Sequence, residues 1–261
     1  LLPRPLHREG DRVDHLGNIL ALQRGRSEDL SLLVAAHMDE VGLMVTHADE
    51  AGMLHVAAVG GLDARVLPAK QVRVGRDRTP GVIAVKPVHK TTADERGKAF
   101  TLEQLVIDVG AANRAEAEKV AARGDYAVFA TGFEDLGDVV TGKAFDDRAG
   151  CAVLAELVRR GPYPFTLRPA FTTMEEIGLR GARVAGYAIA PDAAFVLEGT
   201  ICDDGPKDRE ESPTTELGKG PAISLADRSV IADRRLVRHL QAVARAKGIP
   251  VQLKQPGMGG T

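Results

Sequence analysis

The sequence predicts an α/β protein whose mixed or parallel sheet carries helices on both faces, interrupted by a small β-rich domain. Near-continuous apolar runs, which are typical of strands buried on both faces of a sheet, alternate with amphipathic helical segments. Between about Val45 and Val140 the pattern changes to short strand-like pieces separated by Gly, Pro or charged turns. We therefore expect an α/β domain formed by residues 1–44 and 141–261, and an inserted β-rich domain formed by residues 45–140.

Strands of both domains are expected at apolar runs bounded by turn residues. The runs expected to form the parallel sheet are SLLVAA (31–36), RPAFTTM (168–174), AAFVL (193–197) and PVQLK (250–254). The runs expected in the inserted domain are MLHVAAV (53–59), KQVRV (70–74), GVIAVKP (81–87), EQLVIDVG (103–110) and YAVFATG (126–132).

Helices are expected where apolar residues recur every three to four positions. The segment after Asp147 has a predicted apolar stripe of Val153, Leu154, Leu157 and Val158. A later helix has Asp233 as its predicted N-cap and Gly248 as its predicted C-cap. Its predicted stripe is Leu236, Leu240 and Val243. The inserted domain has one expected helix, which begins at the capping pair Asn113 and Glu116.

The composition limits which binding partners and which cellular compartment are expected. The 261 residues include 34 basic and 36 acidic side chains, and the formal net charge of −2 gives no indication of a nucleic acid or a membrane surface as partner. No apolar run reaches the about 18 residues that a membrane-spanning helix needs. Two cysteines, Cys151 and Cys202, are too few for a disulfide framework. We therefore expect a cytoplasmic protein.

Ionisable side chains follow the ends of three predicted strands: His37 and Asp39, Glu175 and Glu176, and Glu198. Ligands bind at the carboxyl ends of the strands in open α/β sheets, so these side chains are expected at one edge. Asp146 and Asp147, just before a predicted helix, can reach the same edge from a loop.

So many carboxylates cannot lie together in the ionised state unless cations neutralise them. Carboxylates mixed with histidine form a ligand set for Zn²⁺, Mn²⁺ or Co²⁺. A site of this size suits two metals about 3.5–4 Å apart, with one bridging carboxylate and a hydroxide activated between them. Of the adjacent Glu175 and Glu176, one can bind metal while the other takes a proton from the water.

Five motifs, in order along the chain, carry a family resemblance: AHMDEVG, KAFDDRAG, TMEEIGLRGA, LEGT and LGKGPAISLADRS. They resemble the tetrahedral, dodecamer-forming dimetal aminopeptidases of the glutamyl/leucyl type, which were once confused with endoglucanases. GGLDARVLPAKQVRV and IDVGAANRAEAE resemble the dimerisation domain of that family. The resemblance implies a zinc-peptidase-like fold, two divalent metal ions per subunit and self-association into dimers and a tetrahedral dodecamer.

The resemblance also implies a role for each candidate residue. His37 and Glu198 would bind the first metal, and Asp39 would orient His37 from behind. Asp146 would bridge both metals, and its peptide bond to Asp147 would be cis. Glu175 would be the general base and Glu176 a ligand of the second metal.

A further histidine on the second metal is implied after a Gly-Gly-Thr-Asp motif. The printed sequence stops at Gly259-Gly260-Thr261, and we expect that histidine within the next few tens of residues of the natural chain.

The expected function is a metal-dependent aminopeptidase that removes N-terminal residues from short peptides. A dimetal-bound hydroxide would attack the scissile carbonyl, and Glu175 would take its proton and return it to the leaving amine. Two alternatives stay open. One is an amidohydrolase or deacylase that acts on N-acyl amino acids, and the other is a non-catalytic assembly protein with the same fold.

Overall fold

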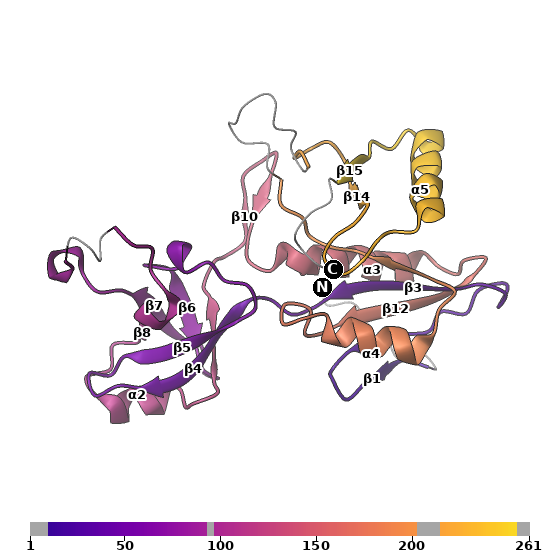
Figure 1. Cartoon of the computed structure of the whole chain (residues 1–261). Helices are drawn as coiled ribbons and strands as arrows, with labels where there is room; N and C mark the ends of the chain where they lie inside the picture. Colours follow the sequence, from indigo (N-terminus) through magenta and orange to yellow (C-terminus); the bar gives the residue numbers. More distant parts are fainter. Residues whose placement is uncertain (1–9, 93–96, 203–214, 255–261) are drawn as a thin grey trace. The chain divides into compact units, whose positions relative to one another are not determined.

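The computed structural model describes residues 10–92, 97–202 and 215–254, and these divide between two compact units (Figure 1). The first, here called the sheet unit, comprises Leu1–Met38, Asp146–Glu175 and Leu179–Thr261. The second, the barrel unit, comprises Asp39–Phe145 and Glu176–Gly178. The segment Gly259-Gly260-Thr261, after which a further histidine is expected, lies outside the described residues.

The sheet unit is built on a five-stranded mixed sheet with the strand order β1-β2-β12-β3-β13 (Figure 1). Its strands are β1 (Arg12–Val13), β2 (Ile19–Leu20), β3 (Ser31–His37), β12 (Thr166–Thr172) and β13 (Ala193–Val196). The strands β12 and β13 both pair with β3 in parallel, whereas β2 pairs with β12 in the antiparallel sense. Three strand-forming runs of the sequence therefore supply the parallel part, and their carboxyl ends point to the same edge.

Helices α3 (Phe145–Arg160) and α4 (Arg180–Ile189) cover opposite faces of this sheet (Figure 1). Alternate residues of a strand point to opposite faces, so β3 can bury residues on both sides. Leu154 of α3 packs in a cluster with Val34 and Ala36. On the other face, Ala185 of α4 packs in a cluster with Leu33 and Ala35. The expectation of helices on both faces is confirmed.

One predicted strand was assigned to the wrong sheet. Residues 252–254 form β15 (Gln252–Lys254), which pairs in parallel with β14 (Ala222–Ser224) in a separate two-stranded sheet. The Gln252 side chain ties this strand to the preceding turn, because its Nε2 donates to the carbonyl oxygens of Glu216 and Gly220 at 2.9 and 2.8 Å. Pairing with β14 and these side-chain bonds therefore hold the segment outside the main sheet.

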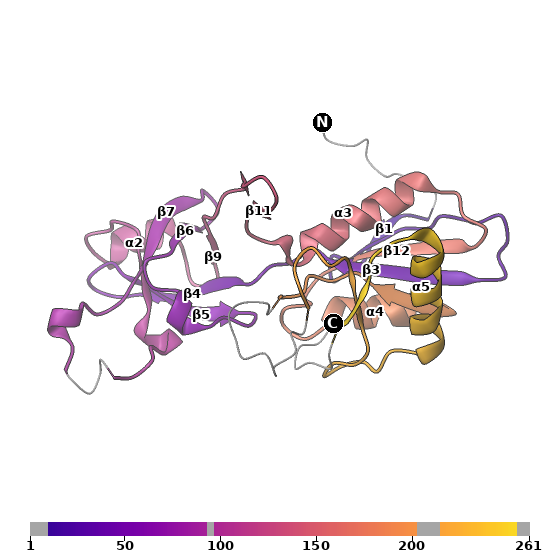
Figure 2. The ribbon, with the colours of Figure 1, turned by 90° about the horizontal axis from the view of Figure 1, so that it is seen from above.

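Helix α5 (Arg234–Lys247), drawn in yellow in Figure 2, has the predicted caps, and its buried face matches the predicted stripe only in part. Asp233 accepts the Arg235 N–H, and Gly248 adopts a left-handed φ of 63°. The helix buries Val237 and Ala244, whereas Val243 of the predicted stripe is 41% exposed. In α3, likewise, Val153 of the predicted stripe is exposed. Among the described residues, the structure contains no helix that could span a lipid bilayer.

Six strands of the barrel unit form a closed barrel in the order β4-β5-β8-β7-β6-β9. They are β4 (Gly42–Ala48), β5 (Leu54–Val59), β6 (Gln71–Val74), β7 (Thr79–Ala84), β8 (Val106–Asp108) and β9 (Tyr126–Phe129). The other elements of this unit are η1 (Ala64–Val66), η2 (Val88–Lys90), η3 (Leu102–Gln104), α2 (Arg114–Val120), β10 (Glu134–Asp135) and β11 (Val140–Thr141). Closure leaves no free edge among the barrel strands.

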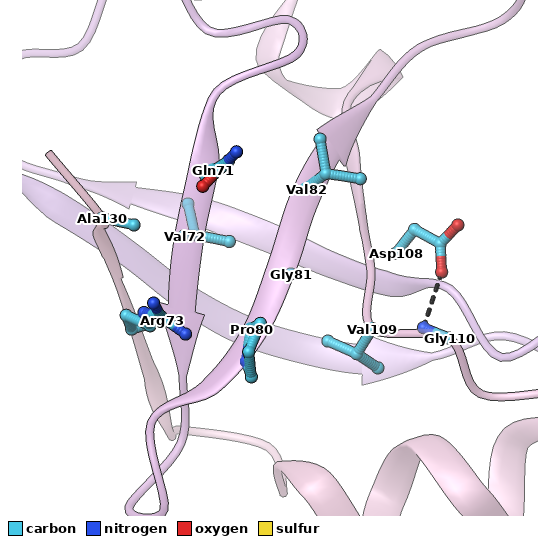
Figure 3. Close-up of a pocket in the computed structure, with 10 residues that line it drawn as sticks. All are labelled: Gln71, Val72, Arg73, Pro80, Gly81, Val82, Asp108, Val109, Gly110 and Ala130. Carbon is cyan, nitrogen blue, oxygen red and sulfur yellow. Dashed lines mark hydrogen bonds between the residues drawn. The ribbon is translucent and has the colours of Figure 1, made fainter.

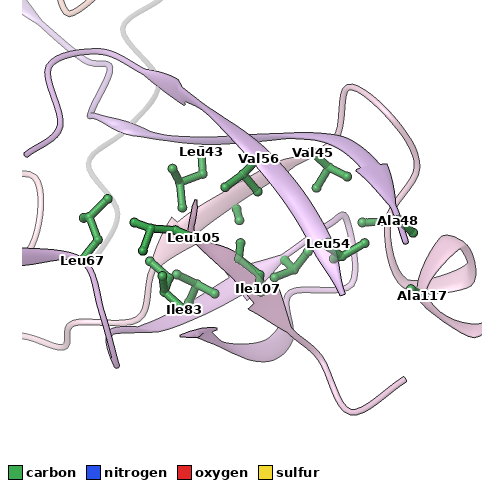
Figure 4. Packing of buried hydrophobic residues seen from close by; sticks show 14 residues of the cluster. Leu43, Val45, Ala48, Leu54, Val56, Leu67, Ile83, Leu105, Ile107 and Ala117 are labelled. Atoms are coloured by element: carbon green, nitrogen blue, oxygen red, sulfur yellow. The ribbon is translucent and has the colours of Figure 1, made fainter. Parts of the chain in front are cut away.

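One apolar cluster fills the barrel (Figure 4). Leu54 and Ile107 are fully buried at its centre, and Leu43 and Ile83 are 1% exposed. Burial alternates over the first half of β5, since Leu54 and Val56 are buried while His55 between them is only partly buried. The period of two that suggested short strands thus corresponds to the inside and outside of a barrel.

Candidate metal centre

The candidate site of the sheet unit is built around His37, the last residue of β3, which is 2% exposed. Its Nε2 lies 3.0 Å from Asp146 Oδ1, 3.3 Å from Glu198 Oε1 and 3.8 Å from Glu175 Oε2. His37, Asp146 and Glu198 each offer one potential ligand atom, and these three atoms lie within 4.8 Å of one another. The structure therefore brings an imidazole and three carboxylates together from four separate parts of the chain.

The parallel sheet explains this convergence. Strand β12 ends at Thr172, which pairs with His37, and Glu175 follows three residues later. Strand β13 ends at Val196, on the other side of β3, and Glu198 follows two residues later. Three neighbouring strands thus deliver their ionisable side chains to the carboxyl edge of the sheet, where ligands bind in open α/β folds.

Asp147 connects this edge to helix α3. It is completely buried, and its Oδ2 accepts the His37 backbone N–H at 3.1 Å while its Oδ1 accepts the Gly150 N–H at 3.0 Å. Asp146 and Asp147 have non-helical backbone angles and a cis peptide bond between them, so regular helix follows Asp147. Asp147 therefore caps the helix and holds the end of β3 beside Asp146.

Gly150 makes that capping contact sterically possible. A Cβ at this position would lie 2.3 Å from Asp147 Oδ1 and 2.6 Å from its Oδ2. The carboxylate thus occupies the space that any other residue's side chain would need. Sequence reasoning assigned no positioning role to Asp147, and the Asp-Asp-Arg-Ala-Gly spacing, with glycine at the third residue after the acid, is the signal for it.

The electrostatics of the site favour a bound cation. Burial raises the pKa of Glu198 to about 7; nearby Asp146 adds to this rise, whereas His37 opposes it. Glu198 Oε2 is buried and has no hydrogen-bond partner among the described residues. Burial likewise raises the pKa of Asp147 to about 6, although the His37 and Gly150 N–H groups work against that change. A divalent ion would supply the missing partner of Glu198 and keep these acids ionised.

The remaining candidates, Asp39 and Glu176, belong to the barrel unit, together with Glu40. Asp39 Oδ2 accepts the Glu176 backbone N–H at 3.2 Å. Glu40 forms an ion pair with Lys143 of the same unit. Its charge is therefore matched locally.

Two further side chains hold the backbone next to His37. Cys151, from the second turn of α3, donates its thiol to the His37 carbonyl oxygen at 3.1 Å. Arg148 Nε donates to the Met38 carbonyl oxygen at 3.3 Å. Cys151 is therefore more than the small buried hydrophobe that an apolar helix suggests, since it also satisfies a carbonyl group at the end of β3.

A hollow of about 480 Å³ lies on the barrel, between the β6–β7 pair and the end of β8 (Figure 3). Figure 3 shows Asp108, whose Oδ1 accepts the Gly110 N–H at 2.8 Å, on its wall. Arg73 and Asp108 are the charged residues that line it. None of the candidate metal ligands lines this hollow.

Comparison with known proteins settles the family. The profile of the M42 glutamyl aminopeptidase family matches residues 17–261. This chain belongs to that family. The family resemblance inferred from the five motifs is confirmed, and M42 peptidases are metallopeptidases, which agrees with the ligand set at the sheet edge.

Similar proteins are known from archaea. The lysyl aminopeptidase of Pyrococcus furiosus is 33% identical over 249 residues, which cover 93% of this chain and 70% of that protein. The TET aminopeptidase of Thaumarchaeota archaeon SCGC AB-539-E09 matches with a TM-score of 0.92 and 36% identity, covering 97% of this chain and 73% of that one. The TET1 peptidase of Pyrococcus horikoshii, which can assemble into a tetrahedron or a large octahedral shell, matches with a TM-score of 0.81 and 31% identity, covering 95% of this chain and 75% of that one.

Proposed function

We propose that this chain is a dinuclear metal-dependent aminopeptidase that removes N-terminal residues from short peptides. The observation that carries the proposal is the convergence of His37, Asp146, Glu175 and Glu198 at the carboxyl edge of the parallel sheet. Membership of the M42 family supports the aminopeptidase activity. The names of relatives differ in the N-terminal residue that they specify, lysyl in one and glutamyl in another, so the preferred residue is left open.

The residues present fit two divalent ions of the Zn²⁺, Co²⁺ or Mn²⁺ type. His37 and Glu198 would hold the first ion, Asp146 would bridge, and Glu176 would contribute to the second. Two bound ions would polarise the scissile carbonyl and lower the pKa of the attacking water, so that a dimetal-bound hydroxide is available near neutral pH. The buried and unpartnered Glu198 Oε2 supports a cation at this place.

Glu175 is proposed as the general base. Its side chain is 16% exposed, and its Oε2 lies 3.8 Å from His37 Nε2, which places a carboxylate beside the proposed ligands. In this role it accepts a proton from the attacking water and returns it to the leaving amine. Asp39 is proposed to orient His37, and Asp147 holds the backbone of the same histidine.

The inserted barrel is proposed to mediate self-association into dimers and a tetrahedral dodecamer. The described barrel unit buries an apolar core of its own, and only Asp39 and Glu176, at its boundary, are site candidates. Solved relatives such as the Pyrococcus horikoshii TET1 peptidase form shells. Light scattering of the full chain should give a dimer or a larger assembly, and a monomer at micromolar concentration would contradict the proposal.

The substrate class is tested by measuring the hydrolysis of a panel of aminoacyl anilides and of their N-acetylated counterparts. The metal content of the same protein preparation is measured alongside. Free-amino substrates should be hydrolysed, and N-acetylated ones should not. Preference for the N-acetylated series would support the deacylase alternative. No hydrolysis of any substrate in the presence of Zn²⁺, Co²⁺ or Mn²⁺ would support the alternative of a non-catalytic assembly protein.

A cytoplasmic location is also proposed, on the low cysteine content alone.

A further inference from the structure

A completely buried asparagine, Asn18, follows the short turn between β1 and β2. Its side-chain oxygen accepts the Thr173 backbone N–H at 2.9 Å and lies 3.2 Å from the Thr173 hydroxyl oxygen. Its side-chain nitrogen donates to the Gly181 carbonyl oxygen at 3.1 Å and to Asp14 Oδ2 at 2.7 Å. One amide thus bonds both sides of the segment 174–180, which contains Glu175.

Backbone hydrogen bonds close the same segment. The Gly181 N–H donates to the Thr173 carbonyl oxygen at 3.0 Å, and the Arg180 N–H donates to the Met174 carbonyl oxygen at 3.1 Å. The Leu179 N–H donates to the carbonyl oxygen of Glu175 itself at 3.0 Å. Glu175 is therefore on a short closed loop whose two ends meet at the Asn18 amide.

The partners of Asn18 determine which way round its amide lies. The Thr173 backbone N–H is a donor and can only face the oxygen, whereas Gly181 and Asp14 present acceptors and can only face the nitrogen. Asp14 Oδ1 also accepts the N–H groups of Leu16 and Asn18, at 2.9 and 3.0 Å, which fixes the turn. The amide consequently has one orientation in which all of these bonds form.

The Asn18 amide packs against Gly181, at the place where any other residue would have its Cβ. A Cβ there would lie 2.4 Å from Asn18 Oδ1 and 2.2 Å from the Thr173 carbonyl oxygen. The close approach of the two sides of the loop is therefore possible only with glycine at this position. Thr173 completes the contact by donating its hydroxyl to the Leu16 carbonyl oxygen at 2.9 Å.

From this geometry we infer that Asn18 and Thr173 are positioning residues for the proposed general base. They hold the loop that carries Glu175 against the β1–β2 turn, and so fix where its carboxylate stands relative to the sheet edge. A general base works only within hydrogen-bond reach of the proton it takes, and a displacement of about 1 Å can cost about 10²-fold in rate. The inference rests on the proposed role of Glu175 and adds residues that touch neither substrate nor metal.

The test measures kcat, KM, metal content, thermal stability and the hydrogen exchange of the 173–181 amides in the metal-loaded protein. Asn18→Ala should lower kcat by at least about 10-fold, with KM within about 2-fold and unchanged metal content, because transition-state stabilisation is lost while ground-state binding is kept. Exchange of the 173–181 amides should become at least about 10-fold faster, because the loop opens more readily.

Thr173→Val and Thr173→Ser provide a matched pair that does not depend on Asn18→Ala folding. Valine keeps the shape and removes the hydroxyl with its bond to Leu16 and its contact with Asn18, so kcat should fall and exchange should rise. Serine keeps the hydroxyl, so both quantities should return toward wild type. Thr166→Val is the control for lost stability, because Thr166 is buried at the start of β12, the strand that ends just before Thr173, and its hydroxyl oxygen accepts the Gly25 N–H at 3.3 Å.

The outcomes separate this inference from the proposed function. Unchanged kcat and unchanged exchange in Asn18→Ala and Thr173→Val, while Glu175→Gln is impaired, would overturn the inference. An equal fall of kcat in Thr166→Val at a matched loss of stability would overturn it as well. Wild-type kcat in Glu175→Gln would instead show that the proposed general base is wrong.

Discussion

The two units bury their side chains differently. The barrel unit encloses one apolar cluster, in which Leu54 and Ile107 are fully buried. The sheet unit divides its apolar residues between two clusters, one on each face of the sheet. All the buried polar side chains among the described residues belong to the sheet unit: Asn18, Gln23, His37, Asp147, Thr166, Thr172 and Thr215.

This difference indicates where function constrains the sequence. Burying a polar group costs about 1–3 kcal/mol unless it is hydrogen-bonded, so a fold that needs only stability uses apolar residues, as the barrel does. The sheet unit keeps buried polar groups such as His37, Asp147 and Asn18, and each of them contacts the candidate site or the loop that bears Glu175. These three buried polar groups therefore support the site, whereas the apolar interior of the barrel stabilises the fold.

The largest effect on catalysis is expected at the adjacent glutamates. Glu175→Gln should lower kcat by at least about 10²-fold, the scale of a general base, while the protein still binds metal. Glu176→Gln should instead lose metal, because it removes a proposed ligand. Steady-state kinetics and metal analysis of both variants distinguish the roles, and exchanged phenotypes would show that the assignment within the pair is wrong.

An intermediate effect is expected at Asp147, which accepts two backbone N–H groups. Asparagine offers one side-chain acceptor oxygen, so Asp147→Asn leaves either His37 N–H or Gly150 N–H without its partner. Metal affinity should fall about 10–100-fold, the scale of residues that orient a ligand from behind. Asp125→Asn is the control in the barrel unit, since its Oδ2 likewise accepts a backbone N–H, that of Ala122. Equal metal affinity in Asp147→Asn and wild type would contradict the positioning role.

The smallest effect on catalysis is expected in the barrel core. Leu54→Ala and Leu154→Ala make the same change at two completely buried leucines, one in each unit. Both should lower stability by about 2–5 kcal/mol. Only Leu154→Ala should also weaken metal binding, because Leu154 packs against β3, which ends in His37. Thermal unfolding with metal titration checks this. Equal loss of metal in the two variants would contradict the claim that the sheet unit, and not the barrel unit, supports the metal site.

The sequence predicted the parts of the fold and site that depend on local signals. Acids that follow apolar runs could be placed at one edge because parallel strands end together. The caps Asp233 and Gly248 could be found because capping depends on a few neighbouring residues. The cis peptide between Asp146 and Asp147 came from the resemblance alone, and the structure contains it.

Features that depend on distant neighbours could not be predicted. Val153 and Val243 fit a helical stripe, yet both are exposed, since the face that a helix buries is set by the elements around it. Asn18 lies 155 positions from Thr173, so no local motif revealed their contact. Residues 250–254 had the composition of a sheet strand, but strand pairing is a tertiary choice, and β15 pairs with β14.

Metal reconstitution tests the central claim most directly, namely that the ionisable side chains at the sheet edge form a divalent-metal peptidase centre. Chelator-treated wild-type protein should lose aminopeptidase activity and regain it with Zn²⁺, Co²⁺ or Mn²⁺, whereas His37→Ala should remain inactive with every ion. Full activity after verified removal of metal, or equal reconstitution of His37→Ala and wild type, would contradict the account.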